Sequence, residues 1–264
     1  MINKSEIIGL IPAAGKALRL GPIPTSKELI TVGFETINGN RYPKTVSSYL
    51  LDQMSDAGIS DFHIVLRKGK WDIPNYYGGG EQFNMNICYQ IADHSYCVPF
   101  TINQAYPFIK NKTVAFGFPD ILIKPRKVFS QLIEKLNANL KTDFIIGLFP
   151  SYDALKEDHL DNTANKVKNN YITNKKALLN SYTWIIAVWQ PSFTKFLHQY
   201  LDKLVKKYSS EELMENECQL SDILNMAIVE GYNADFVFFE KGDHIDIGTP
   251  ERLEKAVHFI KSTL

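Results

Sequence analysis

Cysteine is scarce in this sequence of 264 residues. There are three, Cys88, Cys97 and Cys218, and none of them stands in a C-x-x-C pattern. An odd number of cysteines without that spacing argues against both a disulfide framework and a zinc site built from thiolates. We therefore interpret the three thiols as ordinary small apolar side chains.

An excess of either charge is also absent, because 29 Lys and Arg residues balance 29 Asp and Glu residues. A neutral chain has no long-range field that attracts nucleic acid or an anionic membrane, so we expect neither as a partner. The apolar runs, such as residues 184–189, are strand-sized and far below the roughly 20 residues of a membrane span. No leader-like pattern opens the sequence, and we expect a cytoplasmic location.

The composition is that of a packed protein. Hydrophobic residues make up 45% of the chain and charged residues 22%, as in ordinary globular domains. The length is within reach of one large α/β unit with a sizeable core. We therefore predict a single domain over residues 1–264.

Strand-like and helix-like segments alternate along the chain. Residues 7–12 form an apolar run that ends in a glycine-containing loop, residues 45–58 have apolar side chains at helical spacing, and residues 62–66 form a second apolar run. Further strands are expected around 114–116 and at 143–149, 182–189 and 235–240, and further helices at 126–140, 191–207, 220–229 and 250–261. This alternation predicts an α/β fold: a Rossmann-like three-layer domain with a mostly parallel central sheet. The polar residues 152–176 predict a small β excursion at the surface.

Ligands of open α/β sheets bind beyond the carboxyl ends of the strands, so the residues that follow each strand are the candidate site residues. Gly15 lets backbone N–H groups approach a phosphate, and Arg19 and Lys27 add positive charge in the same loop. The loop has neither the GxxxxGK[ST] spacing of a P-loop nor the GxGxxG fingerprint of a dinucleotide site. Taken alone, a glycine and two cations also fit an ordinary solvated loop.

Two aspartates occupy similar places further along the chain. Asp120 follows Phe116-Gly117-Phe118-Pro119, and Asp246 precedes Ile247-Gly248-Thr249-Pro250. Magnesium prefers carboxylate oxygens together with phosphate oxygens and water, so the pair suits a metal-nucleotide site. Each aspartate alone fits a turn or a helix cap equally well.

Several motifs occur together in a fixed order: Pro12-Ala13-Ala14-Gly15 with Arg19, Ser26-Lys27-Glu28-Leu29, Tyr76-Tyr77-Gly78-Gly79-Gly80, Asp120, and Asp246-Ile247-Gly248-Thr249-Pro250. In this order they resemble the sugar 1-phosphate nucleotidyltransferases, the family of the glucose-1-phosphate thymidylyl- and uridylyltransferases. The resemblance runs from about residue 7 to residue 253.

The resemblance implies an enzyme that joins a nucleoside triphosphate to a sugar 1-phosphate and releases pyrophosphate. It implies Mg²⁺ as the cofactor, held by Asp120 and Asp246, and catalytic contacts to phosphate from Arg19 and Lys27. The remaining implied roles are nucleotide binding by Ala13, Ala14, Gly15, Arg19 and Gln90, and sugar phosphate binding by Gly147 and by Lys175, chosen over its neighbour Lys176.

The sequence departs from the family pattern at two positions near the phosphates. Ala17 replaces the second glycine of the opening loop, and Pro119 replaces the glycine before the first aspartate. These departures favour an alternative, a catalytically silent subunit that senses nucleotide. A cytidylyltransferase for a polyol-type phosphate is the other alternative. The base, the sugar and the oligomeric state, including a homo-oligomer, stay open.

Overall fold

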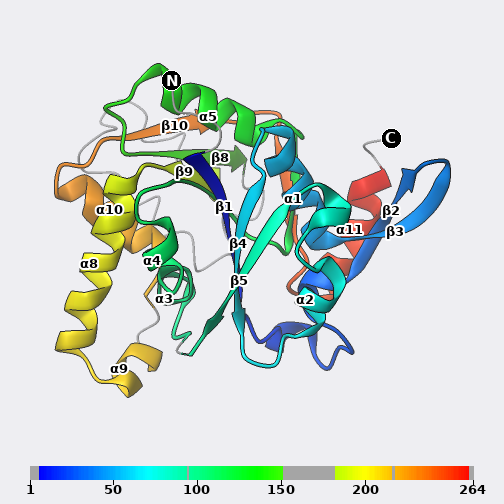
Figure 1. Cartoon of the computed structure of the whole chain (residues 1–264), viewed down its shortest axis with the longest axis horizontal. Coiled ribbons are helices and arrows are strands. Elements are labelled where there is room, and N and C mark those ends of the chain that lie inside the picture. Colours follow the sequence, from blue (N-terminus) through cyan, green and yellow to red (C-terminus); the bar gives the residue numbers. More distant parts are fainter. Residues whose placement is uncertain (1–5, 94, 151–181, 216–217, 262–264) are drawn as a thin grey trace.

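A seven-stranded sheet in the order β10-β8-β9-β6-β1-β4-β5 forms the centre of the computed structural model (Figure 1). The structure describes residues 6–93, 95–150, 182–215 and 218–261. The strands of this sheet are β1 (Ile7–Ala13), β4 (Asp61–Arg67), β5 (Asn86–Ala92), β6 (Thr113–Gly117), β8 (Phe144–Pro150), β9 (Tyr182–Trp189) and β10 (Ala234–Phe238). Strand β9 is antiparallel to both of its neighbours, β6 and β8, and the other pairs are parallel. The predicted α/β class with a mostly parallel sheet is confirmed.

Helices cover both faces of this sheet (Figure 1). The described helices are α1 (Val46–Asp56), α2 (Asp72–Tyr77), α3 (Val98–Asn103), α4 (Tyr106–Ile109), α5 (Val128–Ala138), α8 (Pro191–Lys207), α9 (Ser210–Glu215), α10 (Leu220–Val229) and α11 (Pro250–Lys261). Helix α8 forms because buried residues such as Phe193, Phe196, Leu197 and Leu201 recur on one side, with Pro191 in its first turn, where a missing N–H costs nothing.

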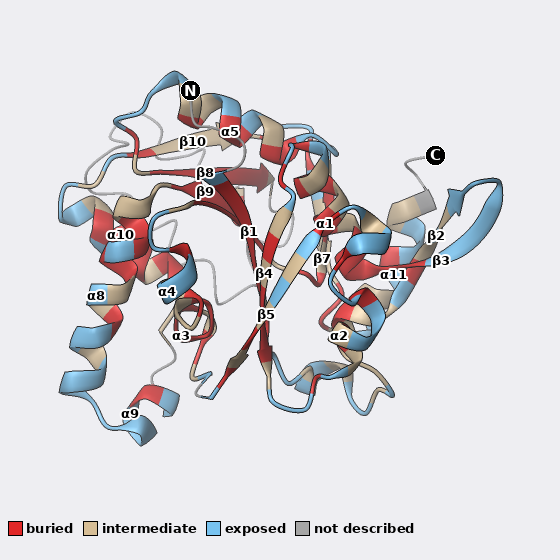
Figure 2. Ribbon diagram, in the orientation of Figure 1, coloured by how far each residue is buried: buried red, intermediate tan, exposed pale blue. Residues whose placement is uncertain are grey.

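The alternation of side chains along β1 explains the three layers. Ile8 and Leu10 pack in one apolar cluster with residues of α3, α4, α8 and α10. Ile7 and Ile11 pack in a second cluster with residues of α1, α2 and α5. Successive strand residues point to opposite faces, so one strand contributes to both cores. The central strands are accordingly buried, whereas the edge strand β5 has exposed positions (Figure 2).

The sequence pattern predicts the long elements better than the short ones. The observed bounds of β9, α8, α10 and α11 are those predicted. Strand β5 and two small sheets were not predicted: β2 (Thr31–Ile37) with β3 (Asn40–Thr45), and β7 (Ile121–Lys124) with β11 (Asp243–Asp246). The β2–β3 hairpin is largely exposed, and β7 and β11 are too short to show a period. The β excursion predicted at residues 152–176 lies outside the described residues.

Within the described ranges, no helix is both long enough and apolar enough to cross a membrane.

Candidate active site

The strand order changes direction between β1 and β6. From β1 the chain proceeds to β4 and β5 on one side, and then crosses to β6 on the other side of β1. Such a reversal of direction is a topological switch point, where open α/β sheets bind ligands. Because β1 and β6 are parallel, the loop that contains Gly15 and the turn that contains Asp120 leave the sheet at the same edge.

Lys27 and Asp120 meet at this edge. The ammonium of Lys27 donates a hydrogen bond to Oδ2 of Asp120 at 2.5 Å, and Asp120 is only 9% exposed. Burial alone would lower the pKa of Lys27, but the charge and hydrogen bond of Asp120, together with the charges of Glu28 and Asp246, outweigh burial and raise this pKa. Lys27 is therefore a fixed cation in the neutral pH range.

Asp246 lies beside Asp120 through the pairing of β7 with β11. In this antiparallel ladder Asp246 is opposite Ile121, and the amide of Ile247 donates to the backbone carbonyl of Asp120 at 3.1 Å. Burial, and then the negative charge of Asp120, raise the pKa of Asp246. The structure thus brings together the two carboxylates that the sequence singled out. Two negative charges therefore lie close to each other.

Two arginines contact Asp246. Nη2 of Arg19 and Nη1 of Arg252 are each 3.6 Å from its Oδ2, and the amide of Gly248 donates to its Oδ1 at 2.7 Å. A Cβ at Gly248 would lie 2.9 Å from both the Arg19 guanidinium and the Asp246 carboxylate, so a side chain here would displace one of these groups. The sequence analysis missed Arg252, although its place in the first turn of α11, directly after the Asp246 motif, was a usable signal.

Gly15 lies against Lys27, since a Cβ at Gly15 would be 3.7 Å from Nζ of Lys27. Ala13 and Ala14 are buried at the end of β1, whereas Gly15 is exposed. Ala17 has φ 55° and ψ 30°, a left-handed conformation that glycine adopts more readily. The loop therefore has a glycine-type backbone at the position where Ala17 replaces a glycine.

Of three other predicted site residues, the structure describes two, Gln90 and Gly147. Nε2 of Gln90 is 2.8 Å from Nδ1 of His63 in the neighbouring strand, so its amide already has a protein partner. A Cβ at Gly147 would lie 2.6 Å from Cγ1 of Ile186, which gives this glycine a packing role. Lys175 is outside the described residues. The ligand contacts assigned to these three residues stay predictions.

The donor set at the switch point fits a divalent cation only if phosphate completes it. Among the described residues, no group of three or more His, Cys, Asp or Glu side chains could hold a metal ion. Asp120 and Asp246 supply two carboxylates, and Mg²⁺ in nucleotide sites uses one or two carboxylates with substrate phosphates and water. In this structure Lys27 and the two arginines balance the negative charges of these carboxylates, and a divalent ion could balance them in the same way.

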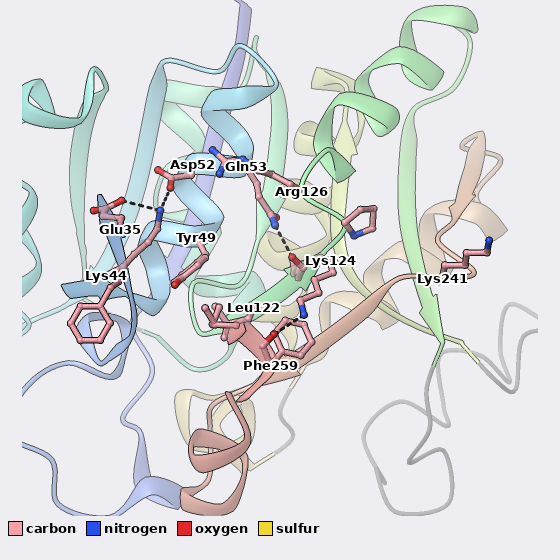
Figure 3. A pocket seen from close by; sticks show the side chains of 14 residues that line it. Glu35, Lys44, Tyr49, Asp52, Gln53, Leu122, Lys124, Arg126, Lys241 and Phe259 are labelled. Carbon is pink, nitrogen blue, oxygen red and sulfur yellow. Dashed lines mark hydrogen bonds and ion pairs between the residues drawn. The ribbon is translucent and has the colours of Figure 1, made fainter. Parts of the chain in front are cut away.

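A separate cavity of about 630 Å³ lies between the β2–β3 hairpin, α1, β7 and α11 (Figure 3). Its lining residues are Phe34, Glu35, Lys44, Tyr49, Asp52, Gln53, Leu122, Ile123, Lys124, Pro125, Arg126, Lys241, Phe259 and Ile260. Lys44 pairs with Glu35 and Asp52, and Lys124 lies over the Phe259 ring. The lining does not include Lys27, Asp120 or Asp246. Because these three residues lie together at the switch point of the sheet, we assign the candidate active site to that point.

No family model matches the sequence, and no curated protein matches it. Solved structures, in contrast, share the fold over nearly the whole chain. A Bacillus anthracis protein assigned as a glucose-1-phosphate thymidylyltransferase, in complex with sucrose, has a TM-score of 0.74 and 20% identity, and the match covers 96% of this chain and 94% of that one.

Two uridine enzymes are also similar. A UTP-bound UGPase of Acinetobacter baumannii has a TM-score of 0.67 and 14% identity, with 97% and 94% of the two chains covered. A UDP-glucose pyrophosphorylase in complex with UDP-glucose has a TM-score of 0.67 and 16% identity, with 97% and 99% covered. The expected resemblance to sugar 1-phosphate nucleotidyltransferases is therefore confirmed at the level of the fold.

Proposed function

We propose that the protein transfers a nucleotidyl group from a nucleoside triphosphate to a sugar 1-phosphate, and that residues 1–264 act as one nucleotidyltransferase domain. A phosphate oxygen of the sugar 1-phosphate attacks the α-phosphorus of the nucleotide. The bond from the α-phosphorus to the oxygen that bridges it to the β-phosphorus breaks, and pyrophosphate leaves with that oxygen. The products are an NDP-sugar and pyrophosphate.

One observation carries this proposal: Lys27 and Arg19, from the loop after β1, contact Asp120 and Asp246 at the switch point of the sheet. A metal-nucleotide substrate requires cations for its phosphates and carboxylates for its metal ion. The loop after β1 supplies the cations, and the residues after β6 and at the end of β11 supply the carboxylates. The fold likeness to UTP- and UDP-glucose-bound enzymes supports the same substrate class.

Mg²⁺ is the proposed cofactor, held by Asp120 and Asp246. When bound, it supplies positive charge to the phosphate oxygens. With an ion on the two carboxylates, Lys27 would be able to exchange its contact with Asp120 for a phosphate oxygen. The phosphate would then supply the negative charge that Asp120 supplies in this structure, where it raises the pKa of Lys27.

The other residues position the substrates. Arg19 is 67% exposed at its side chain and can turn from Asp246 to the departing pyrophosphate. The backbone at Ala13, Ala14 and Gly15 approaches the triphosphate, and Gln90 reads the base. Gly147 and Lys175 hold the sugar phosphate. No side-chain nucleophile is required, because positioning and charge stabilisation accelerate in-line phosphoryl transfer.

The conformation of Ala17 favours an active enzyme over a silent subunit. Its left-handed backbone is a conformation that glycine adopts readily, so alanine is compatible with a glycine-type loop at this position. The cytoplasmic location stays a prediction.

A substrate screen tests the proposal. Common nucleoside triphosphates are incubated with several sugar 1-phosphates and polyol phosphates in the presence of Mg²⁺, and pyrophosphate and the nucleotide product are measured. Formation of an NDP-sugar with one equivalent of pyrophosphate supports the proposal. A CDP-polyol product would favour the cytidylyltransferase alternative. Nucleotide binding in calorimetry without turnover of any pair would favour the silent subunit.

A further inference from the structure

The segment Lys70–Asp72 runs from the β4–α2 connection into the first residue of α2, and it contacts the opening loop on both sides of Lys27. Nζ of Lys70 donates hydrogen bonds to both carboxylate oxygens of Glu28, each at 2.7 Å. These contacts link the residue after Lys27 to the β4–α2 connection, across 42 positions of sequence.

Asp72 binds the residues before Lys27. Its Oδ2 accepts hydrogen bonds from the hydroxyl of Thr25 at 2.9 Å and from the amide of Ser26 at 2.6 Å. Its Oδ1 accepts one from the Ser26 hydroxyl at 2.8 Å. Three donors from two consecutive loop residues therefore converge on one carboxylate.

The Glu28–Lys70 pair is buried, with Glu28 2% and Lys70 7% exposed. Burial raises the pKa of Glu28 and lowers that of Lys70, and each partner opposes the shift of the other. Removing one partner of a buried ion pair strongly destabilises the fold, because the other charge stays buried without compensation. The contact therefore restricts Glu28 to one position relative to β4.

The local helix transmits these contacts to Lys27. Residues Lys27–Leu29 form a 3-10 turn, and the Ser26 carbonyl accepts a hydrogen bond from Leu29 at 2.9 Å. With three residues per turn, successive side chains point in directions about 120° apart. Ser26 and Glu28 both bind the Lys70–Asp72 segment. The side chain of Lys27, which stands between them in the sequence, therefore points in a different direction and reaches Asp120.

We propose that Lys70 and Asp72 are positioning residues, which hold the turn at Lys27 from both sides so that the Lys27 ammonium stays at the reacting phosphates. We call this the 70–72 clamp. The inference rests on the proposed function, because only that function gives Lys27 a phosphate to bind.

Kinetics of Asp72→Asn test the clamp. The amide nitrogen of asparagine cannot accept a hydrogen bond, so the contacts to Thr25 and Ser26 are weakened while the shape is kept. We expect kcat/KM to fall about 10- to 100-fold, whereas Asp56→Asn, which breaks an exposed ion pair with Arg126, should change it less than twofold. Ser26→Ala removes one neutral donor and is the milder variant, with an expected loss of about two- to fivefold.

A double-mutant cycle separates positioning from general loss of structure. In a Lys27→Met background, Asp72→Asn should cause little further loss of kcat/KM, because the clamp acts through Lys27. A further loss as large as that in the wild-type background would overturn the proposal.

Chemical labelling tests the clamp without turnover. Acetic anhydride should acetylate Lys27 several-fold faster in Asp72→Asn than in the wild type, relative to the exposed Lys110 as internal reference. If the wild type releases no pyrophosphate with any substrate pair, the proposed function fails, but faster labelling would still support the clamp. Equal labelling of Lys27 in the two proteins contradicts the clamp whatever the activity.

Discussion

Lys27 and Asp120, separated by 93 positions in the sequence, form an ion pair with 2.5 Å between Nζ and Oδ2. This pair connects the loop after β1 to the turn after β6, and it places a cation directly on one of the two adjacent carboxylates. The proposed chemistry requires that cation to be available to phosphate.

Replacing Lys27 by methionine should reduce kcat/KM by roughly 100- to 1,000-fold, the usual cost of removing one charge-stabilising donor from an active site. Lys27→Arg keeps the charge but spreads it over a planar group, so it should retain only part of the activity. Steady-state release of pyrophosphate measures both. Activity of Lys27→Met within threefold of the wild type would show that Lys27 has no catalytic contact.

The stability contribution of Asp72 should depend on pH. Burial alone would raise the pKa of Asp72, but the hydrogen bonds from Ser26 and Thr25 outweigh it, so the folded-state pKa lies below the ordinary value of 3.8. A lowered folded-state pKa stabilises the protein fully above 3.8, and this stabilisation is lost as the pH falls through the folded-state value.

We therefore expect Asp72→Asn to lower the free energy of unfolding by about 2 kcal/mol at pH 7, from its weakened charge-assisted hydrogen bonds. The difference from the wild type should shrink as the pH falls below 3.8. Urea unfolding at a series of pH values measures it, with Asp56→Asn as the control that changes little. A difference that stays constant from pH 7 to pH 3 would be inconsistent with this role.

Ala17→Gly should leave the protein as stable or make it more stable by up to about 1 kcal/mol. Relief of the left-handed conformation contributes about 1–2 kcal/mol, and the greater freedom of glycine in the unfolded chain offsets part of it. Ala138→Gly, at the exposed end of α5, is the matched control and should cost roughly 0.5 kcal/mol. Thermal unfolding compares them, and an equal loss in both variants would contradict a left-handed Ala17.

Gly147→Ala should cost about 1–3 kcal/mol, because the added methyl group overlaps the side chain of Ile186. In the double variant with Ile186→Ala, the total cost should be smaller than the sum of the two single costs. Denaturant unfolding of the four proteins measures this coupling. Additive costs would remove the packing explanation and leave a sugar contact as the reason for glycine.

The sequence predicted most of this framework because its signals are local. Helix α8 shows its apolar face within one segment, and β9 is a continuous apolar run. Short elements lack such signals: β7 and β11 have four residues each, yet their pairing brings Asp246 beside Asp120. The sequence singled out both aspartates, but not the ladder that joins them.

The clamp residues were not predictable in the same way. Lys70 and Asp72 bind the opening loop through partners 42 to 47 positions away, and nothing in their local sequence distinguishes them from solvated loop residues. Buried polar contacts between distant loops depend on the tertiary fold, which local periodicity does not specify.

Whether Asp120 and Asp246 share one metal site is tested most directly by Mg²⁺-dependent pyrophosphate release in the wild type, Asp120→Ala and Asp246→Ala, with circular dichroism to check the fold. We expect the wild type to release pyrophosphate only when Mg²⁺, a nucleoside triphosphate and a sugar 1-phosphate are all present, and each folded variant to lose this activity. Turnover retained by either variant would contradict a shared site at the two carboxylates.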